Sequence, residues 1–171
     1  MNILKASFCA VTAALAFALP AQADNTGSAV FGTLAFGANG ANGGQYWSPQ
    51  NTVIGAGVEY YYADAANIDT ADFTGTQLII NDMVLPGFNA NGWKMTFTGF
   101  SQMTLVSSDF NPGLTYGLNG STIEVNWVGV GDAPHNFTAV FDVTAVPEPG
   151  TYALMLAGLA GVGFVARRRM S

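Results

Sequence analysis

The chain has 171 residues, of which half are hydrophobic and only 9% are charged, and its formal net charge is −6 at pH 7. Residues 24–146 carry ten acidic groups and one base, Lys94, so this segment has a formal charge of −9. Such a surface repels the phosphates of nucleic acids and anionic lipids, which excludes nucleic-acid binding. The segment is long enough to bury one core, and we expect a single exported domain over residues 24–145.

The N-terminus is typical of a secretory signal peptide. Lys5 precedes an apolar stretch, and the stretch ends in Pro20-Ala21-Gln22-Ala23. Ala21 and Ala23 form an A-x-A pattern, which predicts cleavage before Asp24. We therefore expect residues 1–23 to form a signal helix that passes through a secretion translocon and is removed by signal peptidase. The alternative, a transmembrane helix, is disfavoured because the run is short.

The single cysteine of the chain, Cys9, lies within this signal. Cleavage would leave the mature chain without a thiol. Disulfide bonds, a cysteine nucleophile and a thiolate metal site are then excluded.

The exported segment alternates aromatic and β-branched residues with Thr, Asn and Gly, and helix-period patterning is nearly absent. In chain order, the pattern predicts strands within residues 28–36, 52–63, 76–81, 93–97, 103–106, 114–118, 123–127 and 137–143. Asn119-Gly120 is a strong hairpin signal between two of them. Residues 64–73, with three acids, are expected to form an acidic turn or a short helix.

About eight short strands separated by regular turns predict an all-β fold, an antiparallel β-sandwich or jelly-roll-like domain. One face of each strand is apolar and the other is polar, as two sheets around a shared core require. We expect the core to include Phe97, Ile123, Val125, Trp127, Phe137, Phe141 and Val143.

Catalytic patterns are missing from the sequence. His135 is the only histidine, and because it follows Pro134 at an expected turn we interpret it as a solvated loop residue. Neither Ser107 nor Ser121 lies in a nucleophile elbow, and nothing selects two of the ten acids as a glycosidase pair. We therefore predict no catalytic residues, no cofactor and a non-enzymatic protein.

Two groups of residues could bind a ligand. Asp64, Asp69 and Asp72 form the densest acidic cluster, and such oxygens suit calcium, although their spacing matches no EF-hand and a solvated acidic turn is the simpler interpretation. Several aromatic residues could stack on sugar rings, although strand aromatics more often pack in a core. These aromatics are Tyr46, Trp47, Tyr60, Tyr61 and Tyr62.

The C-terminus combines three features in a fixed order. Val146-Pro147-Glu148-Pro149 is an extended, proline-restricted segment. Residues 151–166 form an uncharged apolar run, about 24 Å long as a helix, which could cross the inner membrane with help from its flanks. Arg167, Arg168 and Arg169 then form a membrane stop that favours a cytoplasmic C-terminus. A plain membrane anchor remains the alternative.

This order resembles the PEP-CTERM sorting signal of Gram-negative bacteria over about residues 146–169. Gly150 is a small departure, since many members carry Ala or Ser there. The resemblance implies that exosortase, a membrane-embedded processing enzyme, recognises Val146 to Pro149. It implies a transient membrane anchor over residues 146–171, followed by transfer to the cell surface or an extracellular matrix.

The sequence thus predicts a non-catalytic surface or matrix protein associated with exopolysaccharide or a biofilm. A carbohydrate-binding module that recognises exopolysaccharide is the second hypothesis. A secreted hydrolase is the third.

Overall fold

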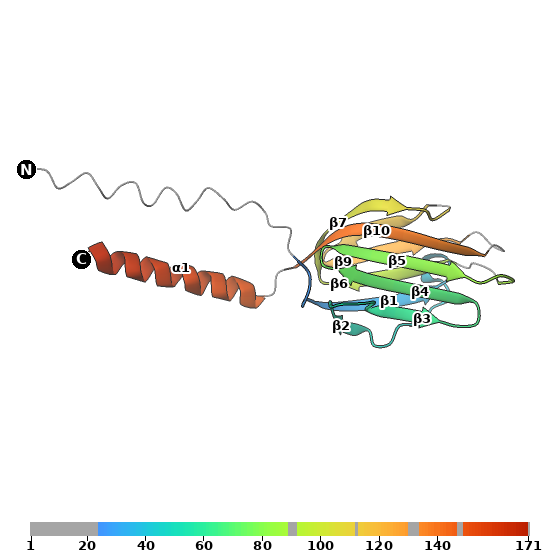
Figure 1. The fold of residues 1–171 in the computed structure, drawn as a ribbon, viewed down its shortest axis with the longest axis horizontal. Helices are drawn as coiled ribbons and strands as arrows, with labels where there is room; N and C mark the ends of the chain where they lie inside the picture. Colours follow the sequence, from blue (N-terminus) through green and yellow to red (C-terminus); the bar gives the residue numbers. More distant parts are fainter. Residues whose placement is uncertain (1–23, 89–91, 112, 130–133, 147–148, 171) are drawn as a thin grey trace, which may run out of the picture.

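The computed structural model describes residues 24–88, 92–111, 113–129, 134–146 and 149–170, and its described part is a two-layered antiparallel β-sandwich followed by one helix (Figure 1). One sheet has the order β2-β1-β6-β9-β8 and comprises β2 (Asn51–Val53), β1 (Ala29–Phe36), β6 (Trp93–Thr98), β9 (Thr122–Trp127) and β8 (Thr115–Asn119). The other has the order β3-β4-β5-β10-β7 and comprises β3 (Tyr60–Ala63), β4 (Asn67–Thr74), β5 (Gln77–Val84), β10 (His135–Ala145) and β7 (Phe100–Ser108). A short 3-10 turn, η1 (Ala38–Gly40), follows β1.

Alternation of apolar and polar residues produces the two layers. In β6 and β9 every second residue is buried, and the same holds along β5 and most of β10. Because side chains of a strand point alternately to its two faces, each sheet presents one apolar face to the other. The predicted all-β antiparallel class is confirmed, with ten strands in the described part of the chain.

Two of the predicted elements differ from the structure. Residues 64–73 were expected to form a turn or a short helix, but most of them belong to strand β4. Every second residue of this strand from Asp69 onward is buried, with Asp69, Ala71 and Phe73 pointing inward, but the acidic residues make the apolar alternation hard to see in the sequence. The expected strand at residues 52–63 is instead two short strands, β2 and β3, and Val58 between them is exposed.

The core between the sheets is rich in aromatic rings. Of the seven predicted core residues, six are buried and Phe137 is partly buried against them. Trp47 and Tyr60 also lie in this core, stacked with ring centroids 4.8 Å apart. The Tyr60 ring packs directly over Gly32, where a Cβ atom would lie only 2.5 Å from the ring. Gly32 thus allows an aromatic ring to pack against the β1 backbone.

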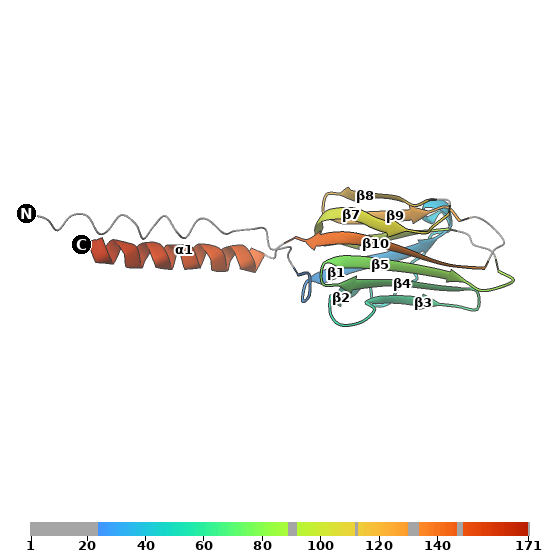
Figure 2. The same ribbon diagram turned by 45° about the horizontal axis from the view of Figure 1, so that its top comes forward.

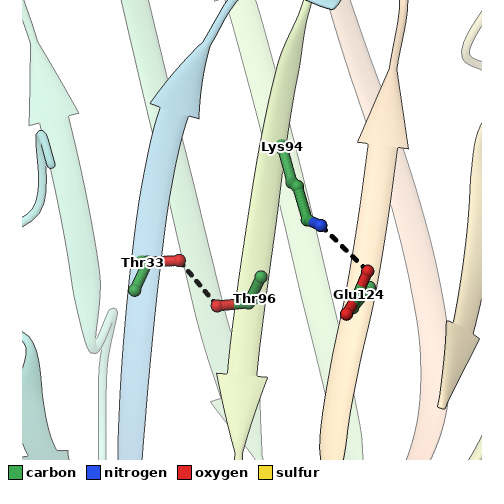
Figure 3. A network of polar contacts seen from close by, with 4 residues as sticks. All are labelled: Thr33, Lys94, Thr96 and Glu124. Carbon is green, nitrogen blue, oxygen red and sulfur yellow. Dashed lines mark hydrogen bonds and ion pairs between the residues drawn. The ribbon is translucent and has the colours of Figure 1, made fainter. Parts of the chain in front are cut away.

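Polar pairs link neighbouring strands on the outer face of the first sheet (Figure 3). The hydroxyls of Thr33 on β1 and Thr96 on β6 are 2.6 Å apart, and Lys94 Nζ lies 2.9 Å from Glu124 Oε2 on β9. Lys94 is the one Lys or Arg of residues 24–146. Its charge is therefore matched by a carboxylate on the outer face, away from the inner face of the sheet.

The start of the described chain is hydrogen-bonded to the end of β10. Asn25 is 1% exposed, and its side-chain amide donates to Val143 O (2.9 Å) and accepts from Ala145 N (2.7 Å). The two ends of the sandwich domain therefore meet at the same end of the sandwich. Figure 2 shows β10 running toward this end beside β5.

The helix α1 (Pro149–Met170) lies outside the sandwich, beyond the end of β10 (Figures 1 and 2). Among the described residues, no helix is both long and apolar enough to cross a membrane. The expected transmembrane span is thus not confirmed and stays a prediction. The expected signal helix at residues 1–23 lies outside the described residues, as do the Pro147-Glu148 pair and residues 131–133 of the turn expected over residues 131–134.

Candidate functional site

The end of the sandwich farthest from α1 contains a row of inward-facing side chains that includes two acids. Strand register places Tyr62 of β3 opposite Asp69 of β4, Asp69 opposite Asp82 of β5, and Asp82 opposite Phe137 of β10. Because these strands are antiparallel neighbours, the four side chains follow one another across the inner face. Two carboxyl groups are thereby placed side by side in the interior.

Asp82 connects the two sheets. It is 1% exposed, and its Oδ2 accepts a hydrogen bond of 2.8 Å from the indole Nε1 of Trp93 on the opposite sheet. His135 Nε2 lies 3.4 Å from the same oxygen, which makes an ion pair when the imidazole carries a proton. Burial raises the pKa of Asp82, and the contacts with Trp93 and His135 only partly offset this effect.

Asp69 is buried more completely than Asp82, and its carboxylate has fewer contacts that could stabilise a negative charge. It is 0% exposed, and neither of its carboxylate oxygens has a hydrogen-bond partner among the described residues. Burial, followed by the nearby charges of Asp82 and Asp64, raises the pKa of Asp69 well above its usual range. A carboxyl in such a place favours its neutral, protonated form.

A cavity of about 260 Å³ opens over Asp82. Its wall includes three rings from three segments, Phe36, Tyr46 and Tyr62, whose centroids are 4.6–5.5 Å apart. The rings are tilted or edge-on to one another, and Tyr46 is 38% exposed. The cavity wall thus combines aromatic rings with a buried acid.

Asp64 adds a second carboxylate to the cavity wall. Its Oδ1 accepts hydrogen bonds of 2.7 Å from both the Ala66 and Asn67 backbone amides, and its Oδ2 accepts one of 2.9 Å from the Tyr62 hydroxyl. Burial opposes ionisation of Asp64, but these hydrogen bonds outweigh it and lower its pKa. Burial and the bond to Asp64 raise the pKa of Tyr62 to about 12, so the phenol stays a donor.

The three acids predicted as weak calcium ligands are not brought together. Asp69 points into the interior, whereas Asp72 lies at an alternate position of β4, on its outer side, and Asp64 lies in the turn after β3. In the described ranges, no group of three or more His, Cys, Asp or Glu residues is arranged to hold a metal ion.

The interpretation of His135 is wrong. His135, expected to be a solvated loop residue, begins β10, and its side chain is only 4% exposed beside Asp82. Trp47 and Tyr60 are 2% and 1% exposed in the core, as is more usual for strand aromatics, and are not accessible for sugar stacking. Of the predicted aromatics, Tyr46 and Tyr62 line the cavity, and Tyr61 is exposed on the other face of β3. Asp82 was not identified as a candidate from the sequence. Its only sequence signal is that an acidic residue occupies an inward position of an apolar strand.

The remaining predicted residues belong to the two ends of the chain. Ala21 and Ala23 precede the described part, which begins at the exposed Asp24. Val146 is 44% exposed directly after β10, Pro149 begins α1, and Arg167 and Arg168 are exposed in its last turns. Arg169 also lies in the last turn of α1.

Comparison with known proteins identifies the tail. Residues 145–169 match the family model of the PEP-CTERM protein-sorting motif. Searches of curated proteins and of solved structures gave no significant match. The chain therefore carries a PEP-CTERM sorting motif, which implies export, processing by the membrane enzyme exosortase, and delivery to the cell surface or the extracellular space.

Proposed function

We propose that this chain is a non-catalytic protein of the cell surface or the extracellular matrix, in which exosortase processes the tail and the β-sandwich is the working part. One observation carries the proposal: the sorting motif at residues 145–169 follows directly on the last strand of the sandwich. Residues 151–166 would anchor the chain in the inner membrane until processing. Removal of residues 1–23 by signal peptidase would precede this step.

The test uses the tagged full chain in an exosortase-containing host. Glu148→Ala, or replacement of Arg167, Arg168 and Arg169 by Gln, should leave an unprocessed form that is retained in the membrane fraction. Replacement of the same three arginines by Lys keeps the positive charge and should preserve processing. If the Ala and Gln variants are processed and delivered like the parent chain, the tail is only an anchor.

A second function, recognition of a carbohydrate such as exopolysaccharide, is favoured by the cavity at the far end of the sandwich. Ring faces of Phe36, Tyr46 and Tyr62 can stack on sugar rings, and the carboxylate of Asp64 can accept hydrogen bonds from hydroxyl groups. Retention of the full chain on the polysaccharide of its host, and its loss in Tyr46→Ala, would support this function. Equal retention of both chains would contradict it.

A further inference from the structure

We infer that the cavity at the end of the sandwich selects a protonated amine, and that its ligand is an amino sugar rather than a neutral one. The inference rests on the proposed carbohydrate-binding function and specifies the chemical class of its ligand. Two of the residues that line the cavity, Asp64 and Asp82, are acids, whereas none is a Lys or Arg. Lys94, the one such base of the domain, is paired with Glu124 on the outer face of the sheet.

The acid in the cavity wall, Asp82, has a second buried acid as its neighbour. Asp69 lies next to Asp82 in the same inward row and is 0% exposed, with no hydrogen-bond partner for either oxygen within the described residues. A buried carboxylate requires a proton, a donor or a cation close by. A cation held in the cavity against Asp82 would supply this charge to the pair from the open side.

The ring walls favour the same ligand. A cation near the face of an aromatic ring is attracted by the ring quadrupole, and Phe36, Tyr46 and Tyr62 provide three such rings. The Tyr62 hydroxyl is held toward Asp64 by its 2.9 Å hydrogen bond. The same rings can pack on the apolar face of a sugar, so an amino sugar uses both the rings and the acids.

A cationic ligand would compete with protons for the negative charge of the acids, whereas a neutral ligand would not. The groups facing the acid pair are Tyr62 from β3, Asp64 from the turn after it, Trp93 from β6 and His135 from β10, with Tyr46 at the cavity wall. A proton on the acid pair, or on His135, reduces the negative charge offered to an ammonium group. Affinity for the amine should therefore rise from mildly acidic to neutral pH, while a neutral sugar should show no such trend.

The experiment titrates the purified full chain with D-glucosamine, N-acetyl-D-glucosamine and D-glucose, with binding followed by calorimetry and tryptophan fluorescence. Glucosamine should bind about tenfold more tightly than the other two, as one cation–π and charge contact allows. Its affinity should rise from mildly acidic to neutral pH, and in this range its binding should release protons, detected by comparing two buffers of different ionisation enthalpy.

Three variants test the assignment. Asp82→Asn retains an acceptor for the Trp93 indole and should remove the preference for glucosamine. Tyr46→Ala should weaken binding of glucosamine about tenfold, whereas Tyr61→Ala, on the opposite face of β3, should not. Circular dichroism verifies that each variant is folded, and Tyr46→Ala removes a partly exposed ring that is outside the core.

The possible failures are distinguishable. Equal affinity for glucosamine and glucose, without pH dependence, would overturn the selection of an amine and leave carbohydrate binding in place. No binding of any of the three sugars would overturn the inference. Neither result would affect the sorting of the chain through its tail.

Discussion

Asp69 shows how a single residue can make the stability of this domain depend on pH. Its carboxyl is 0% exposed, and neither oxygen has a hydrogen-bond partner among the described residues. The neighbouring Asp82 has a donor in Trp93 and a contact with His135, so Asp69 is the less stabilised anion of the pair. The folded protein therefore holds a proton at this position more tightly than the unfolded chain does.

The sign of the pH dependence follows from the raised pKa values of Asp69 and Asp82. In the unfolded chain an Asp titrates near about pH 4. Stability that depends on the protonated carboxyls is therefore complete below about pH 4 and is lost as the pH rises through the raised folded-state pKa. At pH values above the raised folded-state pKa, the folded domain must contain an unpaired buried carboxylate, and local unfolding would expose this charge to water.

Asp69→Asn should remove much of this loss. The amide carries no charge at any pH, so we expect the variant to exceed the parent by about 1–3 kcal/mol in free energy of unfolding at neutral pH, with a flatter pH profile. Urea denaturation at a series of pH values measures both. Asp72→Asn, on the outer face of the same strand, is the matched control. Lower stability of Asp69→Asn than of the parent at neutral pH would show that the ionised carboxylate is needed.

At the scale of elements, β10 connects the acid pair to the tail. It begins at His135 beside Asp82, pairs with both β5 and β7, and ends at Ala145, where Asn25 hydrogen-bonds to its backbone. The buried amide of Asn25 hydrogen-bonds to Val143 O and Ala145 N, just beyond the last residue of β10 that pairs with β5, Asp142 opposite Gln77. The N-terminal segment thus completes the pairing of the last strand.

Asn25→Ala tests this role. The substitution leaves a buried carbonyl and a buried amide unpaired, and we expect a loss of about 2–4 kcal/mol in free energy of unfolding, measured by urea denaturation. Thr26→Ala is the control, because its hydroxyl bonds to Asp24 at the exposed surface. A loss no greater than that of the control would mean that β10 ends securely without Asn25.

The individual strands differ in how well the sequence predicts them. Strands with clear alternation, such as β6 and β9, lie where the pattern predicts, and Asn119-Gly120 forms the expected hairpin between β8 and β9. Strand β4 was overlooked because Asp69, an inward residue, breaks the apolar pattern that marks a buried face. Local patterns predict strands well, but a buried acid in a strand looks like a turn residue.

The candidate site was less predictable because it depends on pairing between distant strands. Asp69 and Asp82 are neighbours only through the β4–β5 register, and Trp93 reaches Asp82 from the opposite sheet. His135 follows a proline, and its burial comes from residues far away in the sequence, Asp82 on β5 and Trp127 on the opposite sheet. The sorting motif could be identified from the sequence alone, because its three features follow one another along the chain.

On the scale of the whole molecule, the two specific features lie at opposite ends of the sandwich. The cavity is formed where β3, β5, β1 and β9 end and where β4, β6 and β10 begin, whereas β10 ends at the side that leads to α1 (Figures 1 and 2). A chain held by its tail would therefore present the cavity away from its point of attachment. This polarity suits a domain that binds something in the surrounding matrix.

The separation also predicts that the sandwich folds without its tail. Within the described part of the chain, its core and its Asn25 bonds involve no residue after Ala145, and α1 lies outside the sandwich. Residues 24–146 alone should therefore unfold in urea with a free energy within about 0.5 kcal/mol of the full chain, the range of an ordinary surface change. A chain shortened to residues 24–142 loses both backbone partners of Asn25 and should not fold cooperatively. A larger loss in the 24–146 chain would mean that the sorting tail is also part of the fold, and that its removal by exosortase would change the domain it delivers.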